Sequence, residues 1–181
     1  MKYQIKTNKS NKILNTNNKK KQKKYNKFFY DWYYMKEVKI TKNYILMKFS
    51  KEDIDLFKTE LFIYLLAKQK NISYIPKLID YNCDKLYIKT ENVGISLQEF
   101  CDEYGCEFED SFLKKIKIMY ERFTTLGYYH NDLRMKNIVI NPSSKKLYLI
   151  DFEFTDTKYK DLDDENIVKK IKSMSKKTKS K

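Results

Sequence analysis

The chain of 181 residues lacks any long apolar run and contains only three glycines and three cysteines. No stretch approaches the roughly 20 apolar residues that a membrane-spanning helix needs, so no transmembrane segment is expected. The first basic residues are followed by more lysine and asparagine instead of an apolar segment, unlike a signal peptide. The cysteines are odd in number and lack metal-ligand spacing. We therefore expect reduced thiols in an intracellular, cytoplasmic protein.

Acidic residues are missing from both ends of the chain. Residues 1–27 contain ten lysines and no acid, and residues 169–181 contain seven lysines and no acid. Subtracting these 17 charges from the formal net charge of +14 leaves residues 28–168 at −3. Two basic, disordered tails are therefore expected around a mildly acidic body. They either stay solvated or make weak, salt-sensitive contacts with nucleic acid or an anionic surface.

The body has the composition of a folded protein, with 41% hydrophobic and 15% aromatic residues. Hydrophobic periodicity predicts strands near 38–40, 44–49, 77–81, 85–90, 138–140 and 147–150. Helices are expected over about 53–69, from Ser96 with Glu99 as a capping box, from the cap Asp110 to just before Gly127, and near 163–174. Strands come early and helices late, which indicates an α+β fold.

The clearest chemical signal is the run His130-Asn-Asp-Leu-Arg-Met-Lys-Asn137, followed by Ile150-Asp-Phe-Glu153. Phosphoryl transfer to an alcohol needs a carboxylate near the attacking hydroxyl, magnesium ligands and cationic support for the phosphate charge. Asp132 and Asn137 offer a carboxylate and an amide in one loop, and Asp151 follows an apolar strand 19 residues after Asp132. The alternative is a surface hairpin that contains turn-forming Asp and Asn residues by chance.

This pattern resembles the H-x-D-L-x-x-x-N catalytic loop and the D-F-G metal motif of the protein-kinase superfamily. The resemblance implies ATP and Mg2+ as cofactors, with Asp132 orienting or deprotonating the acceptor hydroxyl and with Asn137 and Asp151 binding the metal. Arg134 would meet the γ-phosphate, or would be a solvated loop cation. The implied fold is α+β and two-lobed, protein-kinase-like, with a small β-rich N-lobe at 28–93 and a truncated helical C-lobe at 94–168.

Two residues depart from the protein-kinase pattern. Asn131 replaces an arginine, which argues against activation by a phosphorylated loop, and Glu153 replaces a glycine. Both departures resemble the choline/ethanolamine kinases and the aminoglycoside phosphotransferases.

The segment from Tyr44 to Lys48 resembles the kinase strand whose lysine contacts the α- and β-phosphates. Its implied partner is Glu60, which lies in an apolar sector of its helix, flanked on the helical wheel by Leu56, Phe57, Tyr64 and Ala67. The apolar stripe expected for the same helix carries Ile54, Phe57, Leu61 and Leu65. A carboxylate buried there needs a cation, and Lys48 is the expected one. The alternative is a partly exposed glutamate that forms a local pair.

The segment from Leu86 to Leu97 resembles the kinase hinge. Thr90 would lie at the back of the adenine pocket, the backbone of Glu91 and Val93 would bond the adenine edge, and Gly94 would let the hinge turn. The alternative is an ordinary junction between a strand, a turn and a helix.

A glycine-rich loop over the phosphates is missing, because none of the three glycines precedes Lys48. Backbone amides then approach phosphate less easily, so residues 28–43 are expected to form a shortened roof with slow turnover. The chain also ends soon after Asp151 without an Ala-Pro-Glu motif. In its brevity it resembles the small atypical kinase of the KEOPS complex.

Three functions remain open from the residues alone. The first is a protein kinase for Ser/Thr hydroxyls, in which a protein substrate or partner protein completes the C-lobe. The second is a small-alcohol kinase of the choline or aminoglycoside type. The third is a catalytically weak or inactive pseudokinase that binds a partner.

Overall fold

The computed structural model describes residues 6–7, 28–30 and 36–158. The helix expected near 163–174, the tail 169–181 and most of the tail 1–27 lie outside the described residues. The chain divides into two compact units, the N-terminal unit (11–93 and 151–154) and the C-terminal unit (1–10, 94–150 and 155–181). No helix of the described residues combines the length and the apolar character needed to cross a membrane.

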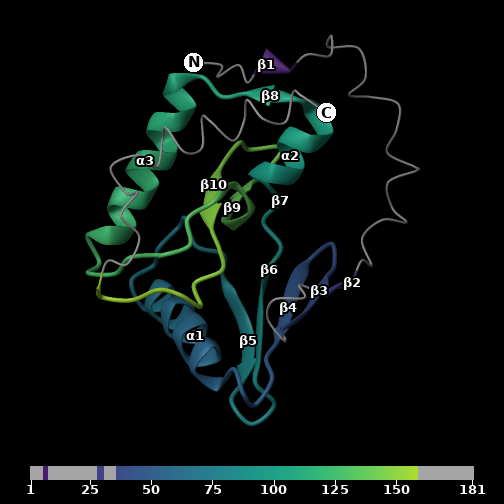
Figure 1. The fold of residues 1–181 in the computed structure, drawn as a ribbon, viewed down its shortest axis with the longest axis vertical. Helices are drawn as coiled ribbons and strands as arrows, with labels where there is room; N and C mark the ends of the chain where they lie inside the picture. The colour runs from purple at the N-terminus through teal and green to yellow at the C-terminus, as the bar shows by residue number, and fades with distance from the viewer. Residues whose placement is uncertain (1–5, 8–27, 31–35, 159–181) are drawn as a thin grey trace. The chain divides into compact units, whose positions relative to one another are not determined.

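The N-terminal unit is built on a five-stranded antiparallel sheet with the order β2-β3-β4-β6-β5 (Figure 1). Its strands are β2 (Phe28–Tyr30), β3 (Glu37–Ile40), β4 (Tyr44–Lys48), β5 (Leu78–Asn82) and β6 (Tyr87–Glu91). The turn between β3 and β4 closes where the Tyr44 N–H donates to Thr41 Oγ1 at 3.0 Å. The segment 31–35, part of the roof expected over 28–43, lies outside the described residues.

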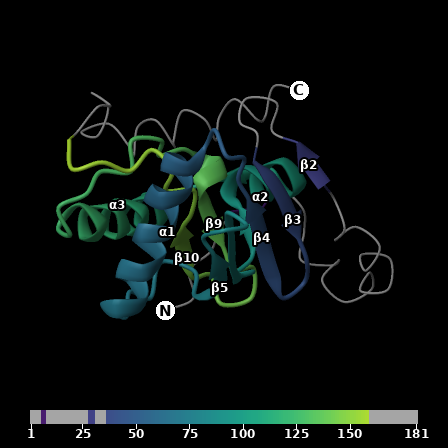
Figure 2. The same ribbon diagram turned by 90° about the horizontal axis from the view of Figure 1, so that it is seen from below.

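Side chains alternate between the two faces of this sheet, as the pleat requires. Met47 of β4 pairs with Ile88 of β6, and both are buried on the inner face. Helix α1 (Ile54–Gln69) lies along this face, where the Phe57 ring meets the Phe49 ring edge-on at 5.6 Å between centroids (Figure 2). The inner face and α1 therefore form the core of the N-terminal unit.

The buried face of α1 differs from the predicted stripe. Phe57 and Leu61 are buried as expected, but Ile54 is 40% exposed and Leu65 is 37% exposed. Their places in the core are taken by Glu60, Ile63, Tyr64 and Ala67. The Glu60 carboxyl group faces inward from this helix, where it accepts a hydrogen bond from the Phe152 N–H.

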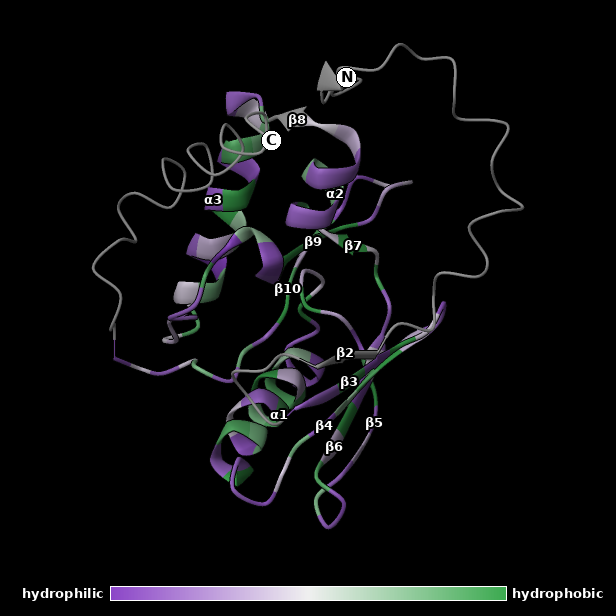
Figure 3. Ribbon diagram, turned by 45° about the vertical axis from the view of Figure 1, so that its right-hand side comes forward, coloured by the Kyte–Doolittle hydropathy of each residue, from purple (hydrophilic) through white to green (hydrophobic). Residues whose placement is uncertain are grey.

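The C-terminal unit carries a three-stranded sheet of order β10-β9-β7 and two helices. Its elements are β7 (Ile95–Ser96), α2 (Leu97–Tyr104), β8 (Cys106–Glu107), α3 (Asp110–Thr124), the 3-10 turn η2 (Met135–Asn137), β9 (Ile138–Ile140) and β10 (Leu147–Leu149). Strand β1 (Lys6–Thr7), inside the segment expected to be a tail, pairs with β8. Apolar and polar residues are interspersed along α3 (Figure 3). Most of its apolar residues are buried, whereas Ile118 is 38% exposed.

Both helix starts in this unit can be compared with the sequence. The capping box of α2 is confirmed, because Ser96 Oγ accepts from the Glu99 N–H at 3.1 Å while the Ser96 N–H donates to Glu99 Oε2 at 3.0 Å. The predicted cap of α3 is wrong by one residue. Glu109 has the extended backbone of a cap, so Asp110 lies in the first turn, where its charge suits the helix dipole.

The expectation of three reduced thiols is also wrong. Cys101, almost fully buried in α2, is disulfide-bonded, whereas Cys83 is free and exposed. An odd number of cysteines leaves room for one bond, and the fold decides which thiols meet.

Candidate active site

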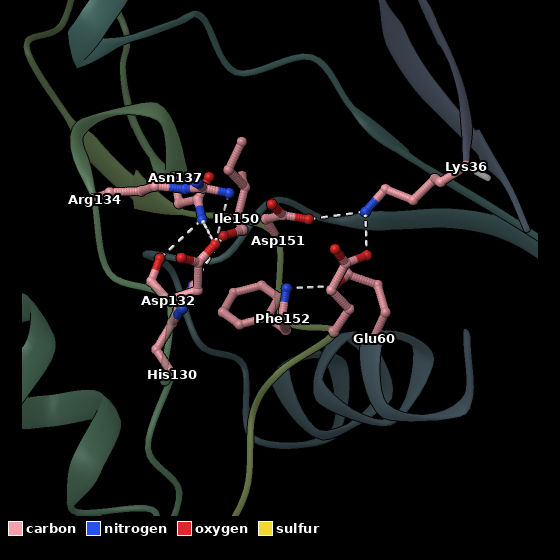
Figure 4. A network of polar contacts seen from close by, with 10 residues as sticks. Lys36, Glu60, His130, Asp132, Arg134, Asn137, Ile150, Asp151 and Phe152 are labelled. Atoms are coloured by element: carbon pink, nitrogen blue, oxygen red, sulfur yellow. Dashed lines mark hydrogen bonds and ion pairs between the residues drawn. The ribbon is translucent and has the colours of Figure 1, made fainter. Parts of the chain in front are cut away.

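The C-terminal unit holds the loop 130–137, in which Asp132 is fixed by two neighbours. Asn137 Nδ2 donates to the Asp132 backbone oxygen at 2.9 Å and to its carboxylate Oδ2 at 2.8 Å. Arg134 Nη2 lies 2.9 Å from the same Oδ2 (Figure 4). Two donors therefore hold one carboxylate oxygen, and the side chain of Asp132 remains 24% exposed. The geometry brings together all three residues expected from the loop.

His130 and Asn137, at the two ends of this loop, both contact Ile150, the residue that precedes Asp151. His130 is fully buried, and its Nε2 lies 2.9 Å from the Ile150 carbonyl oxygen. The Ile150 N–H donates to the Asn137 carbonyl oxygen at 3.1 Å. The only histidine of the sequence thus positions the strand end from which the predicted metal ligand extends.

Two residues of the motif adopt left-handed backbone conformations. Asn131 has φ +59° and Asp151 has φ +69°. Asparagine and aspartate tolerate this region better than most residues, which gives a local reason for asparagine where protein kinases carry arginine. Asn131 Nδ2 also donates to the Lys158 carbonyl oxygen at 3.3 Å. Conformations of this kind cost free energy and gather at functional sites.

The N-terminal unit holds Asp151 beside a lysine that the sequence analysis missed. Lys36 Nζ lies 2.8 Å from Asp151 Oδ1 (Figure 4). It also lies 2.7 Å from Glu153 Oε2. The Lys36 side chain is only 12% exposed. Glu60 of α1 accepts a hydrogen bond from the Phe152 N–H through Oε2, so it lies against the same segment.

The expected pair between Lys48 and Glu60 does not form. Lys48 Nζ lies 3.9 Å from Glu37 Oε2 instead, and its side chain is 52% exposed. The physical reason is the pleat: Met47 and Phe49 face the core, so Lys48 between them must face outward. Glu60 is completely buried, as predicted, and the lysine near it is Lys36.

Charge in this buried group is unevenly shared among three carboxyl groups and one ammonium. Burial, opposed by Lys36 but reinforced by Asp151 and Glu153, raises the pKa of Glu60 to about 8. Burial lowers the pKa of Lys36, yet the carboxylates of Asp151, Glu60 and Glu153 outweigh it and raise that pKa above its ordinary value. Glu60 is therefore the carboxyl group that is mostly neutral at pH 7. Lys36 is the cation that forms ion pairs with Asp151 and Glu153.

The predicted hinge residues end strand β6. Thr90 is buried opposite Ile45 of β4. The Glu91 N–H donates to the Lys77 carbonyl oxygen at 2.9 Å, and Glu91 Oε1 accepts from the Lys77 N–H at 3.0 Å. The end of β6 is thus held in place by hydrogen bonds, with Val93 buried just beyond it.

A magnesium ion fits these residues only as part of a nucleotide complex. Among the described residues, no group of three or more His, Cys, Asp or Glu side chains is arranged to hold a metal. Magnesium is commonly bound by one or two protein oxygens together with phosphate oxygens and water. Asp151 offers a carboxylate, and Asn137, whose Nδ2 is engaged by Asp132, offers its amide oxygen. Each of these oxygens, taken by itself, suits a metal that arrives with phosphate.

The family model for the lipopolysaccharide kinase (Kdo/WaaP) family matches residues 86–180, just over half of the chain. The chain belongs to this family. The matched region contains the predicted hinge, the loop 130–137 and Asp151, while Lys36, Lys48 and Glu60 precede it. Among curated proteins, no sequence matches the chain significantly.

Solved kinase structures share the fold of this Kdo/WaaP family member. Monomeric WbdD matches with a TM-score of 0.53 and 16% identity, covering 74% of this chain and 34% of its own. The Rad53 kinase domain with SCD2 matches with a TM-score of 0.54 and 23% identity, covering 67% of this chain and 48% of its own. The Cydia pomonella granulovirus kinase PK-1 matches with a TM-score of 0.52 and 16% identity, covering 67% of this chain and 47% of its own. The chain spans a third to a half of these proteins, and the predicted kinase-like α+β fold is confirmed.

Proposed function

We propose that the protein is an ATP- and magnesium-dependent phosphotransferase that acts on a hydroxyl group. The observation that carries this proposal is Asp132, whose carboxylate is held at Oδ2 by Asn137 and Arg134. These contacts fix the direction of the carboxylate and leave its second oxygen for an acceptor hydroxyl. A base needs this kind of positioning within hydrogen-bond reach of the proton that it accepts.

In the proposed reaction, the acceptor oxygen forms a bond to the γ-phosphorus of ATP. The bond between that phosphorus and the β–γ bridging oxygen breaks, the hydroxyl proton passes to Asp132, and ADP leaves. Asn137 and Asp151 would hold magnesium, which supplies charge neutralisation at the phosphates. Arg134, half exposed beside Asp132, would add positive charge near the transferred group.

The nucleotide would bind along the end of β6. Thr90 would stand behind the adenine, and the Glu91 carbonyl and the Val93 N–H would bond its edge. The Glu91 N–H already donates to Lys77, which supports the carbonyl as the group that Glu91 offers to the base.

The acceptor class is the finer part of the proposal. The family description favours a sugar hydroxyl of a lipopolysaccharide-like glycolipid as the first candidate. Protein Ser/Thr hydroxyls and small alcohols such as choline are the alternatives expected from the motif residues.

Transfer of labelled γ-phosphate tests the proposal. Wild type should label an acceptor in a panel of Kdo-containing glycolipid, unstructured protein and choline. Asp132→Asn should reduce the rate by about 10²–10⁴-fold, because the general base is lost. Asp102→Asn, on the exposed side of α2, is the matched control and should keep the rate.

The panel also decides the acceptor, since the substrate that is labelled names the class. Absence of labelling in every arm, together with absence of magnesium-ATP binding, would refute the proposed function.

A further inference from the structure

The inner face of β4 carries no lysine. Strand register pairs Glu37 with Lys48 and Val38 with Met47, so these pairs lie on opposite faces of the sheet. Lys48 shares the outer face with residues that line one open hollow: Tyr44, Leu46, Asp80, Lys85, Tyr87 and Lys89. A lysine that contacts a nucleotide on the inner face must therefore come from another strand.

Lys36 reaches the inner face from the residue just before β3. Continuing the register by one step places Lys36 opposite Phe49, and its Nζ lies 5.2 Å from the centre of the Phe49 ring. Side chains of paired residues point to the same face, so Lys36 shares the face of Phe49 and Met47. Its ammonium then meets Asp151 and Glu153, beyond that face.

Glu153 has a role that its position in the motif does not suggest. It is buried, and Lys36 Nζ at 2.7 Å is its ion-pair partner. A buried carboxylate without a cation is strongly unfavourable, so Lys36 stabilises Glu153 in this place. A glycine in this place would leave Lys36 with fewer carboxylates to direct its ammonium toward Asp151.

We propose that Lys36, and not Lys48, is the cation that contacts the nucleotide phosphates, and that Glu153 positions it. This inference rests on the proposed function. Lysine acts on phosphate as a compact point charge, and a desolvated ammonium interacts more strongly than an exposed one. Lys36 is desolvated beside the predicted metal ligand, whereas Lys48 is solvated on the far face of the sheet.

The test compares Lys36→Met with Lys48→Met in the full chain. Magnesium-ATP affinity is measured by calorimetry, and kcat and KM by transfer of labelled phosphate. Lys36→Met should lower kcat/KM by about 10²-fold or more, as expected for loss of one electrostatic contact to the reacting group. Lys48→Met should stay within about threefold of wild type, a range expected for an exposed pair. Lys39→Met, on the same strand as the Glu37 pair and exposed, controls for the loss of one positive charge.

Two further variants separate contact from folding. Lys36→Met removes the ammonium beside the buried Glu153 carboxylate, so Lys36→Met with Glu153→Gln lowers that burial penalty and should fold while remaining inactive. Lys36→Arg keeps the charge and should recover part of the magnesium-ATP affinity. Glu153→Gln alone should raise KM more than it lowers kcat, because Lys36 remains present but is held less firmly.

The outcomes distinguish the inference from the proposed function. If wild type transfers phosphate and the folded double variant matches it, or if Lys48→Met alone abolishes binding, the assignment to Lys36 is overturned and the function stands. If wild type neither binds magnesium-ATP nor transfers phosphate, both fail.

Discussion

At the scale of single residues, the buried group around Asp151 is governed by charge balance. Among the described residues, three carboxyl groups lie around one ammonium, and a neutral Glu60 reduces the uncompensated charge of this low-dielectric group from −2 to −1. Glu60 is the neutral carboxyl group because it is the most deeply buried, and burial outweighs the backbone hydrogen bond from Phe152, which lowers its pKa. Lys36 then remains charged between Asp151 and Glu153.

This balance predicts a pH-dependent stability that Glu60→Gln removes. The pKa of Glu60 is raised to about 8 in the folded protein from 4.5, so the folded state binds more protons than the unfolded state between these values. Stability from this group is therefore complete below pH 4.5 and is lost as pH rises through 8, by at most about 1.4 kcal/mol per pH unit.

The measurement is urea unfolding from pH 5 to 9 in metal-free buffer. The difference between wild type and Glu60→Gln in the free energy of unfolding should move in favour of the variant as pH rises. Glutamine keeps a carbonyl oxygen for the Phe152 N–H, so the comparison isolates the titration. A difference that does not change with pH would contradict the raised pKa.

At the scale of elements, the junction before β7 depends on a close backbone approach. Gly94 has φ +149°, and a Cβ placed there would lie 2.2 Å from the carbonyl oxygen of Ile140 in β9. Strands β7 and β9 pair directly at Ile95 and Ile140. A side chain at this position therefore pushes apart two strands of the C-terminal sheet.

We expect Gly94→Ala to lower the free energy of unfolding by about 2 kcal/mol or more, through clash and backbone strain together. Gly105→Ala is the matched control. Gly105 has φ +59° with no atom within 4 Å of its Cβ position, so only left-handed strain of about 1 kcal/mol applies. Equal decreases of the free energy of unfolding in the two variants, measured by urea unfolding, would show that the close approach of Gly94 to Ile140 adds nothing to the destabilisation.

At the scale of the whole molecule, the predicted ligand residues are divided between the two units. Asn137 belongs to the C-terminal unit and Asp151 to the N-terminal unit. A ligand that binds only the folded protein stabilises it, by about 2.7 kcal/mol at 100 times its Kd. Magnesium-ATP at that concentration should thus raise Tm by roughly 5–10 °C for a chain of this size.

Thermal unfolding with magnesium-ATP, with ATP and EDTA, and with Asp151→Asn checks this prediction. The shift should be largest with magnesium and should shrink in EDTA and in the variant, because metal and carboxylate act together. Asp84→Asn, in an exposed turn, is the control and should keep the full shift. An equal shift in EDTA would rule out a role for the metal in binding.

The local features of this protein were readable from the sequence because they depend on near neighbours. The capping box at Ser96 and Glu99, the hairpin of β9 and β10, and the burial of Glu60 were all expected and are confirmed. Each rests on spacing within one element or on the periodicity of one helix. The kinase-like fold followed from two short motifs in a fixed order, and the family match confirms it. The roles of the site residues and of the lysine-rich tails remain predictions.

The tertiary structure decided which lysine meets the buried carboxyl groups. Lys48 matched a strand motif, but side chains alternate between the two faces of β4, so Lys48 points outward. This orientation could have been predicted from the apolar Met47 and Phe49 on either side of it. The position of Lys36 beside these carboxyl groups could not be predicted from its neighbours in the sequence. Its contacts with Asp151 and Glu153 span more than 110 positions and depend on strand register, which sequence spacing does not specify. The resemblance identified the loop and the aspartate predicted to bind metal, and the folded sheet determined the cation beside that aspartate.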